Sequence, residues 1–160
     1  KMESGSIGIN YKSARLEIRD RTSFTDVLKM DFFQKMEQLE IDQCMVLSTC
    51  NRSEVFFFYD TDDQFQKIKA LYLQMFEGVE LEQYLFTLAG TEAIAYLFRI
   101  AAGLESLVLG EDQILGQVKD ALDLSKAMGF SKKEMNKVVR EAITCAKKIK
   151  TELKISFKTS

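Results

Sequence analysis

A cysteine and an arginine two residues apart are the residues of this sequence best suited to covalent chemistry. Cys50 and Arg52 lie in residues 47–54 (LSTCNRSE), between an apolar stretch and an aromatic one. A cysteine thiolate is a nucleophile, and a nearby positive charge favours the thiolate over the thiol. Arginine also holds a carboxylate through two parallel hydrogen bonds. The segment indicates either a nucleophile beside a carboxylate anchor or a cysteine with a structural role in a turn.

A second polar cluster lies in residues 102–119 (AGLESLVLGEDQILGQVK). Gln113 and Gln117 are four residues apart, so they share one face of a helix. Glu111 and Asp112 suit the first turn of that helix, because negative charge is favourable there. Two amides and a carboxylate on one surface can bind a polar ligand. An ordinary amphipathic helix with an acidic first turn explains the same pattern.

Alternating and helical patterns predict the elements that position these residues. The order is β-α-β-β-α-β, which fits a ferredoxin-like antiparallel sheet with two helices on one face. Everything after residue 91 reads as helical, so we expect an α+β fold with a ferredoxin-like subdomain (1–90) followed by a bundle of about three helices (91–160). The predicted strands are 6–11, 44–49, 55–59 and 84–88, and the predicted helices of the first part are 24–39 and 65–76.

The last predicted helix carries a capping-box signature, Ser131 and Glu134, in which each side chain bonds the other residue's backbone N–H. Its apolar face predicts packing inward. Cys44 and Cys145 are expected to be small buried hydrophobic residues. The inward face consists of Met135, Val138, Val139, Ala142, Ala146 and Ile149.

Composition excludes several classes of protein. The chain has 160 residues, 46% hydrophobic and 29% charged, which is typical of a soluble globular protein with a proper core. No apolar run approaches the roughly 20 residues that span a bilayer. A net charge of −2 argues against non-specific coating of nucleic acid. Three cysteines at unrelated spacings predict neither disulfides nor a zinc site, and with no signal peptide they suit the reducing cytoplasm.

The two polar segments resemble signatures of the glutamyl-tRNA reductase family. Residues 48–52 (STCNR), followed by SE and an aromatic strand, resemble its nucleophile loop. Residues 103–119 (GLESLVLGEDQILGQVK) resemble its second signature, usually GLDSMVLGEPQILGQVK. Residues 8–24 (GINYKSARLEIRDRTSF) and 95–103 (AYLFRIAAG) are similar to the family's opening and to the lead-in of the second signature. The likeness covers nearly the whole chain.

The resemblance implies a catalytic domain that forms a thioester. The family's cysteine, here Cys50, attacks the ester of glutamyl-tRNA, and NADPH then reduces the thioester to glutamate-1-semialdehyde for tetrapyrrole (porphyrin) biosynthesis. By position Tyr96 is the second candidate catalytic residue, and Arg52 is the anchor for the substrate's side-chain carboxylate. The implied substrate-binding residues are Thr49, Asn51, Arg52, Ser106, Glu111, Asp112, Gln113 and Gln117.

Three positions depart from the family pattern. Tyr96 stands where a histidine usually precedes LFR, Tyr11 replaces the histidine of GINHK, and Asp112 replaces the proline of GEPQ. The chain contains no histidine at all. A tyrosine has a pKa of about 10, so it donates a hydrogen bond but is a poor base near neutrality.

The resemblance also implies partners and parts outside this sequence. No G-x-G-x-x-G motif is present, so the NADPH-binding domain and a dimerising helical domain are expected to follow residue 160. We expect no metal, no membrane, a homodimer in the full-length protein, and glutamate-1-semialdehyde aminomutase as a partner. A basic cluster in the last third reads either as a solvated helix face or as a contact to the tRNA backbone. Its members are Lys132, Lys133, Lys137, Arg140, Lys147, Lys148, Lys150 and Lys154.

Two other functions remain open on the sequence. A degenerate relative that lacks the histidine would be a binding module for charged tRNA or a protein partner, without turnover. A thiol redox sensor would use Cys50 beside Arg52.

Overall fold

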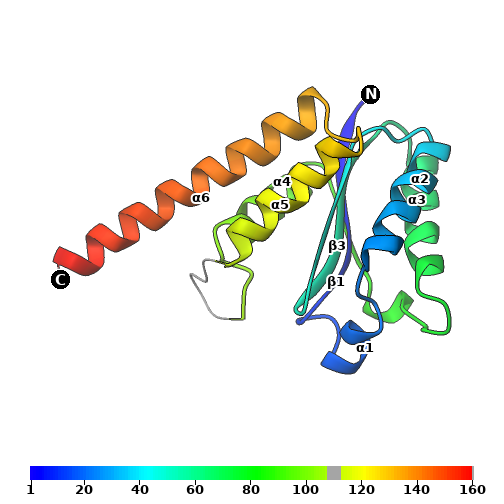
Figure 1. The fold of residues 1–160 in the computed structure, drawn as a ribbon, viewed down its shortest axis with the longest axis horizontal. Coiled ribbons are helices and arrows are strands. Elements are labelled where there is room, and N and C mark those ends of the chain that lie inside the picture. Colours follow the sequence, from blue (N-terminus) through cyan, green and yellow to red (C-terminus); the bar gives the residue numbers. More distant parts are fainter. Residues whose placement is uncertain (108–112, 160) are drawn as a thin grey trace.

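The computed structural model describes residues 1–107 and 113–159 as an antiparallel sheet with helices on both faces (Figure 1). The α+β class expected from the sequence is confirmed. The elements in chain order are β1 (Glu3–Asn10), α1 (Leu16–Asp20), α2 (Asp26–Gln38), β2 (Cys44–Thr49), β3 (Arg52–Tyr59), α3 (Asp62–Met75), a 3-10 turn (Glu82–Tyr84), β4 (Phe86–Ala89), α4 (Thr91–Ala101), α5 (Gln113–Ala127) and α6 (Lys133–Thr159).

The four strands are ordered β2-β3-β1-β4, and every neighbouring pair is antiparallel. The two strands joined by α2, β1 and β2, lie on either side of β3. The two strands joined by α3, β3 and β4, lie on either side of β1. This split arrangement makes β1 and β3 the central strands. The residues at the ends of these two strands therefore lie side by side in the middle of the sheet.

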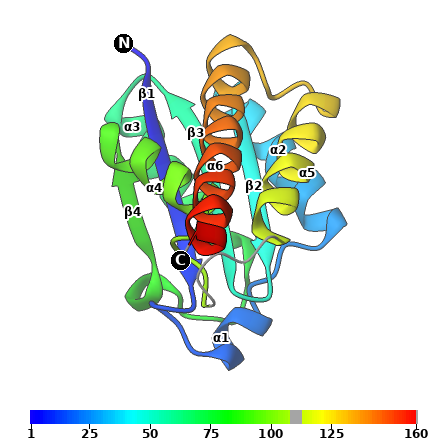
Figure 2. The ribbon, with the colours of Figure 1, turned by 90° about the vertical axis from the view of Figure 1, so that its left-hand side faces the viewer.

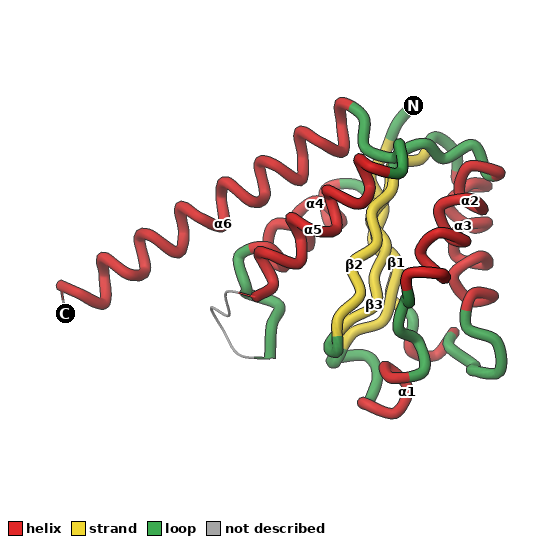
Figure 3. The backbone as a smooth tube through the Cα atoms, in the orientation of Figure 1, coloured by secondary structure: helices red, strands yellow, loops and turns green. Residues whose placement is uncertain are grey.

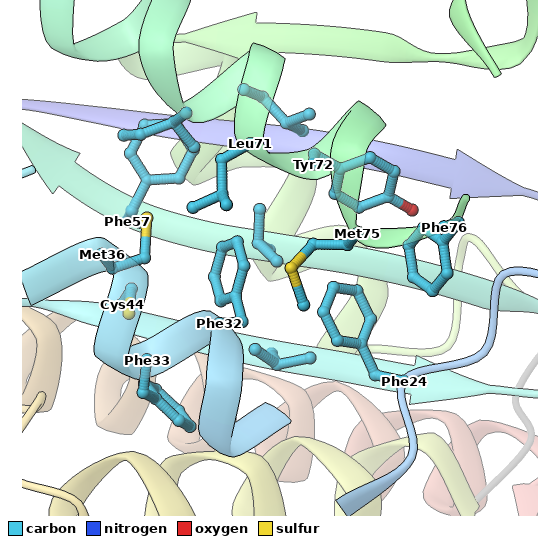
Figure 4. Packing of buried hydrophobic residues seen from close by; sticks show 14 of the residues in the cluster. Phe24, Phe32, Phe33, Met36, Cys44, Phe57, Leu71, Tyr72, Met75 and Phe76 are labelled. Atoms are coloured by element: carbon cyan, nitrogen blue, oxygen red, sulfur yellow. The ribbon is translucent and has the colours of Figure 1, made fainter. Parts of the chain in front are cut away.

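One face of the sheet is covered by α2 and α3, as the sequence predicts. Aromatic side chains dominate this core: the ring centroid of Phe24 lies 5.6 Å from that of Phe32 and 5.0 Å from that of Phe76. Phe57 of β3 and Cys44 of β2 are fully buried in the same cluster (Figure 4), so the expectation for Cys44 is confirmed. Each buried ring removes a large apolar area from water, so these rings contribute strongly to the stability of this side.

The other face is covered by α4, α5 and α6 (Figures 1 and 2). Met45, Leu47 and Phe56 of the sheet pack into the same cluster as these helices. The sequence predicted a bundle that follows the sheet, whereas the structure uses the second face of the sheet as a packing surface for it. Burial on both faces explains why β2 and β3 read as nearly continuous apolar runs. The division into subdomains 1–90 and 91–160 stays a prediction.

The boundaries of several elements differ from the expectation. β3 begins at Arg52, three residues before the predicted strand, so the turn after β2 contains only Cys50 and Asn51. The last strand begins at Phe86, after a 3-10 turn, and the short helix α1 was not predicted. The predicted helix start at Glu111 and Asp112 lies outside the described residues.

The start of α6 is held by Gln43, and the predicted capping box is absent. Ser131 Oγ is buried without a hydrogen-bond partner among the described residues. Gln43 Oε1 instead accepts from the backbone N–H of Lys132 (3.2 Å) and of Met135 (2.9 Å), and Gln43 Nε2 donates to Glu134 (3.1 Å). The inward face is as expected: Met135, Val139, Ala142 and Ala146 are buried, and Val138 and Ile149 are partly buried. Cys145 is only half-buried, so the prediction of a buried side chain is wrong there, because the residue lies beside the inward face.

Candidate active site

Cys50 lies at the tip of the β2–β3 hairpin, with an exposed thiol. The backbone around it is fixed by three hydrogen bonds. Asn51 N–H donates to Thr49 Oγ1 (3.1 Å), Tyr11 N–H donates to the Asn51 carbonyl (2.9 Å), and Arg19 Nε donates to the Cys50 carbonyl (3.2 Å). Figure 3 shows the hairpin end beside the loop that leads to α1. A rigid hairpin therefore presents the sulfur at the edge of the sheet, which is the placement a nucleophile needs.

Arg52 and Glu54 form a buried ion pair behind the hairpin tip. They lie two residues apart on β3, so both side chains point to the face covered by α4, α5 and α6. The Arg52 side chain is 2% exposed and the Glu54 side chain 3%, and Arg52 Nη1 lies 3.1 Å from Glu54 Oε1. Because Glu54 compensates the charge of Arg52, the pair contributes less positive potential at Cys50 than a free arginine would.

Tyr96 of α4 and Asn10 of β1 complete a four-residue network. Tyr96 OH donates to Glu54 Oε2 and accepts from Asn10 Nδ2 (3.0 Å) and Arg52 Nη1 (3.3 Å). Burial raises the pKa of Tyr96, and the neighbouring Glu54 charge and hydrogen bond raise it further. Burial also raises the pKa of Glu54, an increase that Arg52 partly offsets. Tyr96 is thus a neutral phenol whose single proton is directed at Glu54.

The segment after α4 covers the outer edge of Arg52. Arg52 Nη2 donates to the Glu105 carbonyl, next to Ser106, which is half-buried. The Glu105 carboxylate is held by Lys12 Nζ (3.0 Å) and Arg99 Nε (3.1 Å). Burial acts to raise the pKa of Glu105, but the hydrogen bonds from Lys12 and Arg99 outweigh it and lower that pKa overall. The segment carrying Ser106 is therefore tied both to β3 and to the end of β1.

The structure brings some of the expected site residues together. Arg52 and Tyr96 are in direct contact, and Arg52 bonds the residue before Ser106. Thr49 and Asn51 flank Cys50 on the hairpin. Gln113 and Gln117 are exposed on the first turns of α5, and Glu111 and Asp112 lie outside the described residues.

Three contributors were missed on the sequence: Asn10, Glu54 and Glu105. Glu54 was read as part of a loop, although its spacing of two from Arg52 is the signal that both face one side of a strand. Asn10 and Glu105 gave no local signal, because their partners come from distant segments.

Among residues 1–107 and 113–159, no group of three or more histidine, cysteine, aspartate and glutamate side chains is placed to hold a metal ion. Over the same residues, no helix is both long enough and apolar enough to cross a membrane.

The chain is similar to proteins of known family. The family model described as "Glutamyl-tRNAGlu reductase, N-terminal domain" matches residues 7–153. A glutamyl-tRNA reductase of Clostridium novyi is 42% identical over 156 residues, 97% of this chain and 38% of that protein. One of Geobacillus kaustophilus is 39% identical over 91% of this chain and 33% of its own length. The solved glutamyl-tRNA reductase from Methanopyrus kandleri superposes with a TM-score of 0.78 at 28% identity, over 93% of this chain and 34% of that one. The chain spans about a third of the length of these relatives.

Proposed function

This chain belongs to the glutamyl-tRNA reductase family, as the N-terminal domain, and from this premise we propose that Cys50 captures the glutamyl group of glutamyl-tRNA as a thioester. The exposed thiol on the fixed hairpin tip is the observation that carries the proposal. Cys50 Sγ attacks the ester carbonyl, a carbon–sulfur bond forms, the carbon–oxygen bond to the terminal ribose breaks, and the free tRNA leaves with a proton on that oxygen. Sulfur suits this capture because the thioester that it forms is more reactive toward the later hydride transfer than the original ester is.

In this proposal Arg52 recognises the side-chain carboxylate of the glutamyl group. Arginine has five N–H donors, and Glu54, Tyr96 and the Glu105 carbonyl account for three of them among the described residues. The remaining donors suit a substrate carboxylate. Since Arg52 is only 2% exposed, the segment around Glu105 has to shift for the carboxylate to reach it.

Other side chains are assigned to the substrate by position. Thr49 and Asn51 precede and follow Cys50 on the hairpin, and Ser106 follows Glu105, whose carbonyl accepts from Arg52. Tyr96 acts through its hydrogen bonds, by holding Glu54 and Arg52 in place, because a buried phenol with a raised pKa is no base near neutrality. The remaining assigned positions are Glu111, Asp112, Gln113 and Gln117.

NADPH supplies the hydride that releases glutamate-1-semialdehyde in the whole protein. The sequence of this chain has no glycine-rich phosphate loop, so we assign the capture half-reaction to its residues. Tetrapyrrole biosynthesis in the cytoplasm, homodimerisation and association with the aminomutase are further proposals for the whole protein.

The proposal is tested by the loss of glutamate from charged tRNA without NADPH. The unaltered chain should release free tRNA in an amount equal to the protein, followed only by slow turnover as water hydrolyses the thioester. Cys50→Ser should abolish release, since no histidine is present to deprotonate a serine hydroxyl. Cys145→Ser is the matched control and should behave like the unaltered chain. Equal release by Cys50→Ser, or none by the unaltered chain, would overturn the proposal and favour a binding module.

The role of Arg52 needs a variant that keeps the fold intact. Arg52→Ala leaves Glu54 buried without its partner, which by itself costs about 3–5 kcal/mol of stability. Replacing both members together, Arg52→Gln with Glu54→Gln, removes the charge without leaving one uncompensated. This variant should fold but need at least tenfold more glutamyl-tRNA for half-maximal capture. An unchanged concentration dependence would show that Arg52 is not the anchor.

A further inference from the structure

Positive and negative charge are separated along this chain. Residues 1–112 contain 11 lysines and arginines against 19 aspartates and glutamates, a net charge of −8. Residues 113–160 contain 11 basic residues against 5 acidic ones, a net charge of +6. The near-neutral total therefore conceals a basic region built by α5 and α6. Charge asymmetry of this kind is typical of a protein that binds a polyanion.

The basic region contains a groove between the two helices. α5 and α6 run side by side in opposite directions, joined by a short loop (Figures 1 and 2). A groove of about 300 Å³ lies between them, and four cations line it: Lys119, Lys126, Arg140 and Lys147. Leu122 and Ile143 are buried at its base, and Asp123 is its one acidic residue among those described.

The cations face one another in two pairs. Lys119 and Lys126 are seven residues apart on α5, and Arg140 and Lys147 are seven apart on α6, which is about 10 Å along each axis. In an antiparallel hairpin this spacing places Lys119 across from Lys147 and Lys126 across from Arg140. All four side chains are exposed, and none forms an ion pair within 4.0 Å with another described residue. Facing cations repel one another until an anion lies between them.

We propose that the groove between α5 and α6 binds the phosphodiester backbone of the tRNA whose glutamyl group Cys50 captures. The inference rests on the proposed function for the identity of the polyanion and on the groove for its location. Two cation pairs about 10 Å apart suit two separate phosphates along a nucleic acid strand better than one small anion. The apolar base accommodates the methylene stems of the lysines while their ammonium groups face outward.

The test measures direct binding of a fluorescently labelled glutamate-tRNA transcript, without an attached amino acid, to the 160-residue chain. The readout is fluorescence anisotropy. The double charge reversal Arg140→Glu with Lys147→Glu should weaken binding on the order of tenfold or more at moderate salt. It should also reduce the slope of log affinity against log salt concentration by about two, one for each lost phosphate contact. Because both side chains are exposed, the circular dichroism spectrum should be unchanged.

The matched control is Lys35→Glu with Lys67→Glu. These two lysines line a groove between α2 and α3, on the other side of the sheet, and their replacement changes the net charge by the same amount. Its affinity and salt slope should stay within twofold of the unaltered chain. If the control pair weakens tRNA binding equally, only the net charge matters. If the Arg140 and Lys147 variant binds tRNA as tightly as the unaltered chain, the groove is not the binding site. Either result overturns the proposal.

A second measurement separates this proposal from the one for Cys50. A small activated ester of glutamate, which has no tRNA, should acylate Cys50 in the groove variant at the same rate as in the unaltered chain. Reduced acylation would mean that the charge reversal disturbs the catalytic hairpin, and this too would contradict the groove's role. If the unaltered chain fails to react with both this ester and charged tRNA while the groove still governs tRNA affinity, only the catalytic proposal fails.

Discussion

The hydroxyl of Tyr96 donates its hydrogen bond to the carboxylate of Glu54, and less than a tenth of either side chain is exposed. Tyr96 comes from α4 and Glu54 from β3, so this bond joins the helical layer to the sheet directly behind the hairpin that carries Cys50. The same hydroxyl accepts from Asn10 and Arg52. The hydroxyl therefore uses its one donor position and both acceptor positions within this network, which holds Arg52 and Glu54 in place.

Removing the Tyr96 hydroxyl should affect stability more than chemistry. Tyr96→Phe deprives Glu54 of one donor and leaves Asn10 Nδ2 with only its longer contact to Glu54 Oε2 (3.5 Å), which should lower the free energy of unfolding by about 1–3 kcal/mol. The rate of thioester formation at saturating glutamyl-tRNA should stay within about fivefold, because Cys50 keeps its place. Urea unfolding and single-turnover capture measure the two effects. A loss of capture of a hundredfold in a stably folded Tyr96→Phe would make Tyr96 a catalytic residue.

The buried ion pair should dominate the stability of this region. Glu54→Gln keeps the shape of the side chain but leaves Arg52 as an uncompensated buried charge, which should cost on the order of 3–5 kcal/mol in urea unfolding. Glu17→Gln removes the partner of Arg15 in an ion pair whose side chains are 68% and 81% exposed. That control should unfold like the unaltered chain, since exposed pairs contribute little. Similar losses from both substitutions would contradict the importance of burial here.

Because β1 lies close to β3 at Gly8, any side chain at this position should destabilise the fold. A Cβ atom at Gly8 would lie 2.5 Å from the Ser53 carbonyl oxygen and 2.7 Å from Glu54 Cα, so the backbone of one strand would have to move. Gly8→Ala should lower stability by about 1–3 kcal/mol, as overpacking generally does. Gly116 lies on α5 with nothing within 4 Å of its added Cβ. Gly116→Ala should therefore raise stability by up to about 1 kcal/mol, because alanine favours a helix over glycine. Thermal unfolding of both variants gives the comparison, and a tolerated Gly8→Ala would contradict the strand spacing.

The pH dependence of stability should include a contribution from Glu105. Its pKa is lower in the folded state than in the unfolded chain, so its ionised form favours folding. This contribution is complete above the unfolded pKa and disappears as the pH falls through the folded pKa. The stability difference between the unaltered chain and Glu105→Gln should be present at pH 7 and vanish in strong acid. A difference that grows as the pH falls would show that the ion pairs with Lys12 and Arg99 have the opposite effect.

The sequence predicts much of this fold because its signals are local. The apolar run at Cys44–Thr49 predicts both that strand and its bounds, and the helical spacing of apolar residues locates α2 and α3 to within a few residues. The start of β3 was missed because Arg52 and Glu54 are charged, and charged residues after a turn read as loop. Their burial depends on Tyr96 and Asn10, which lie 44 residues after Arg52 and 44 residues before Glu54 in the chain.

The same limit explains the start of α6. Ser131 and Glu134 have the spacing of a capping box, and that local signal is what the sequence offers. In the folded chain Gln43, 91 residues before Glu134, provides the acceptor for the first turn and a donor for Glu134 itself. A local pattern can be read from a sequence, whereas a partner brought in by the fold cannot.

The central claim is that Cys50 forms a covalent bond to glutamate, and the most direct measurement is the intact mass of the chain after incubation with glutamyl-tRNA in the absence of NADPH. We predict a mass increase of one glutamyl group per chain, located by peptide mapping on the peptide that contains Cys50 and removed by neutral hydroxylamine, which cleaves thioesters. Cys44→Ser and Cys145→Ser should retain the adduct, and Cys50→Ser should lack it. An adduct that persists in Cys50→Ser, or an unaltered chain that gains no mass while the tRNA stays charged, would contradict the claim.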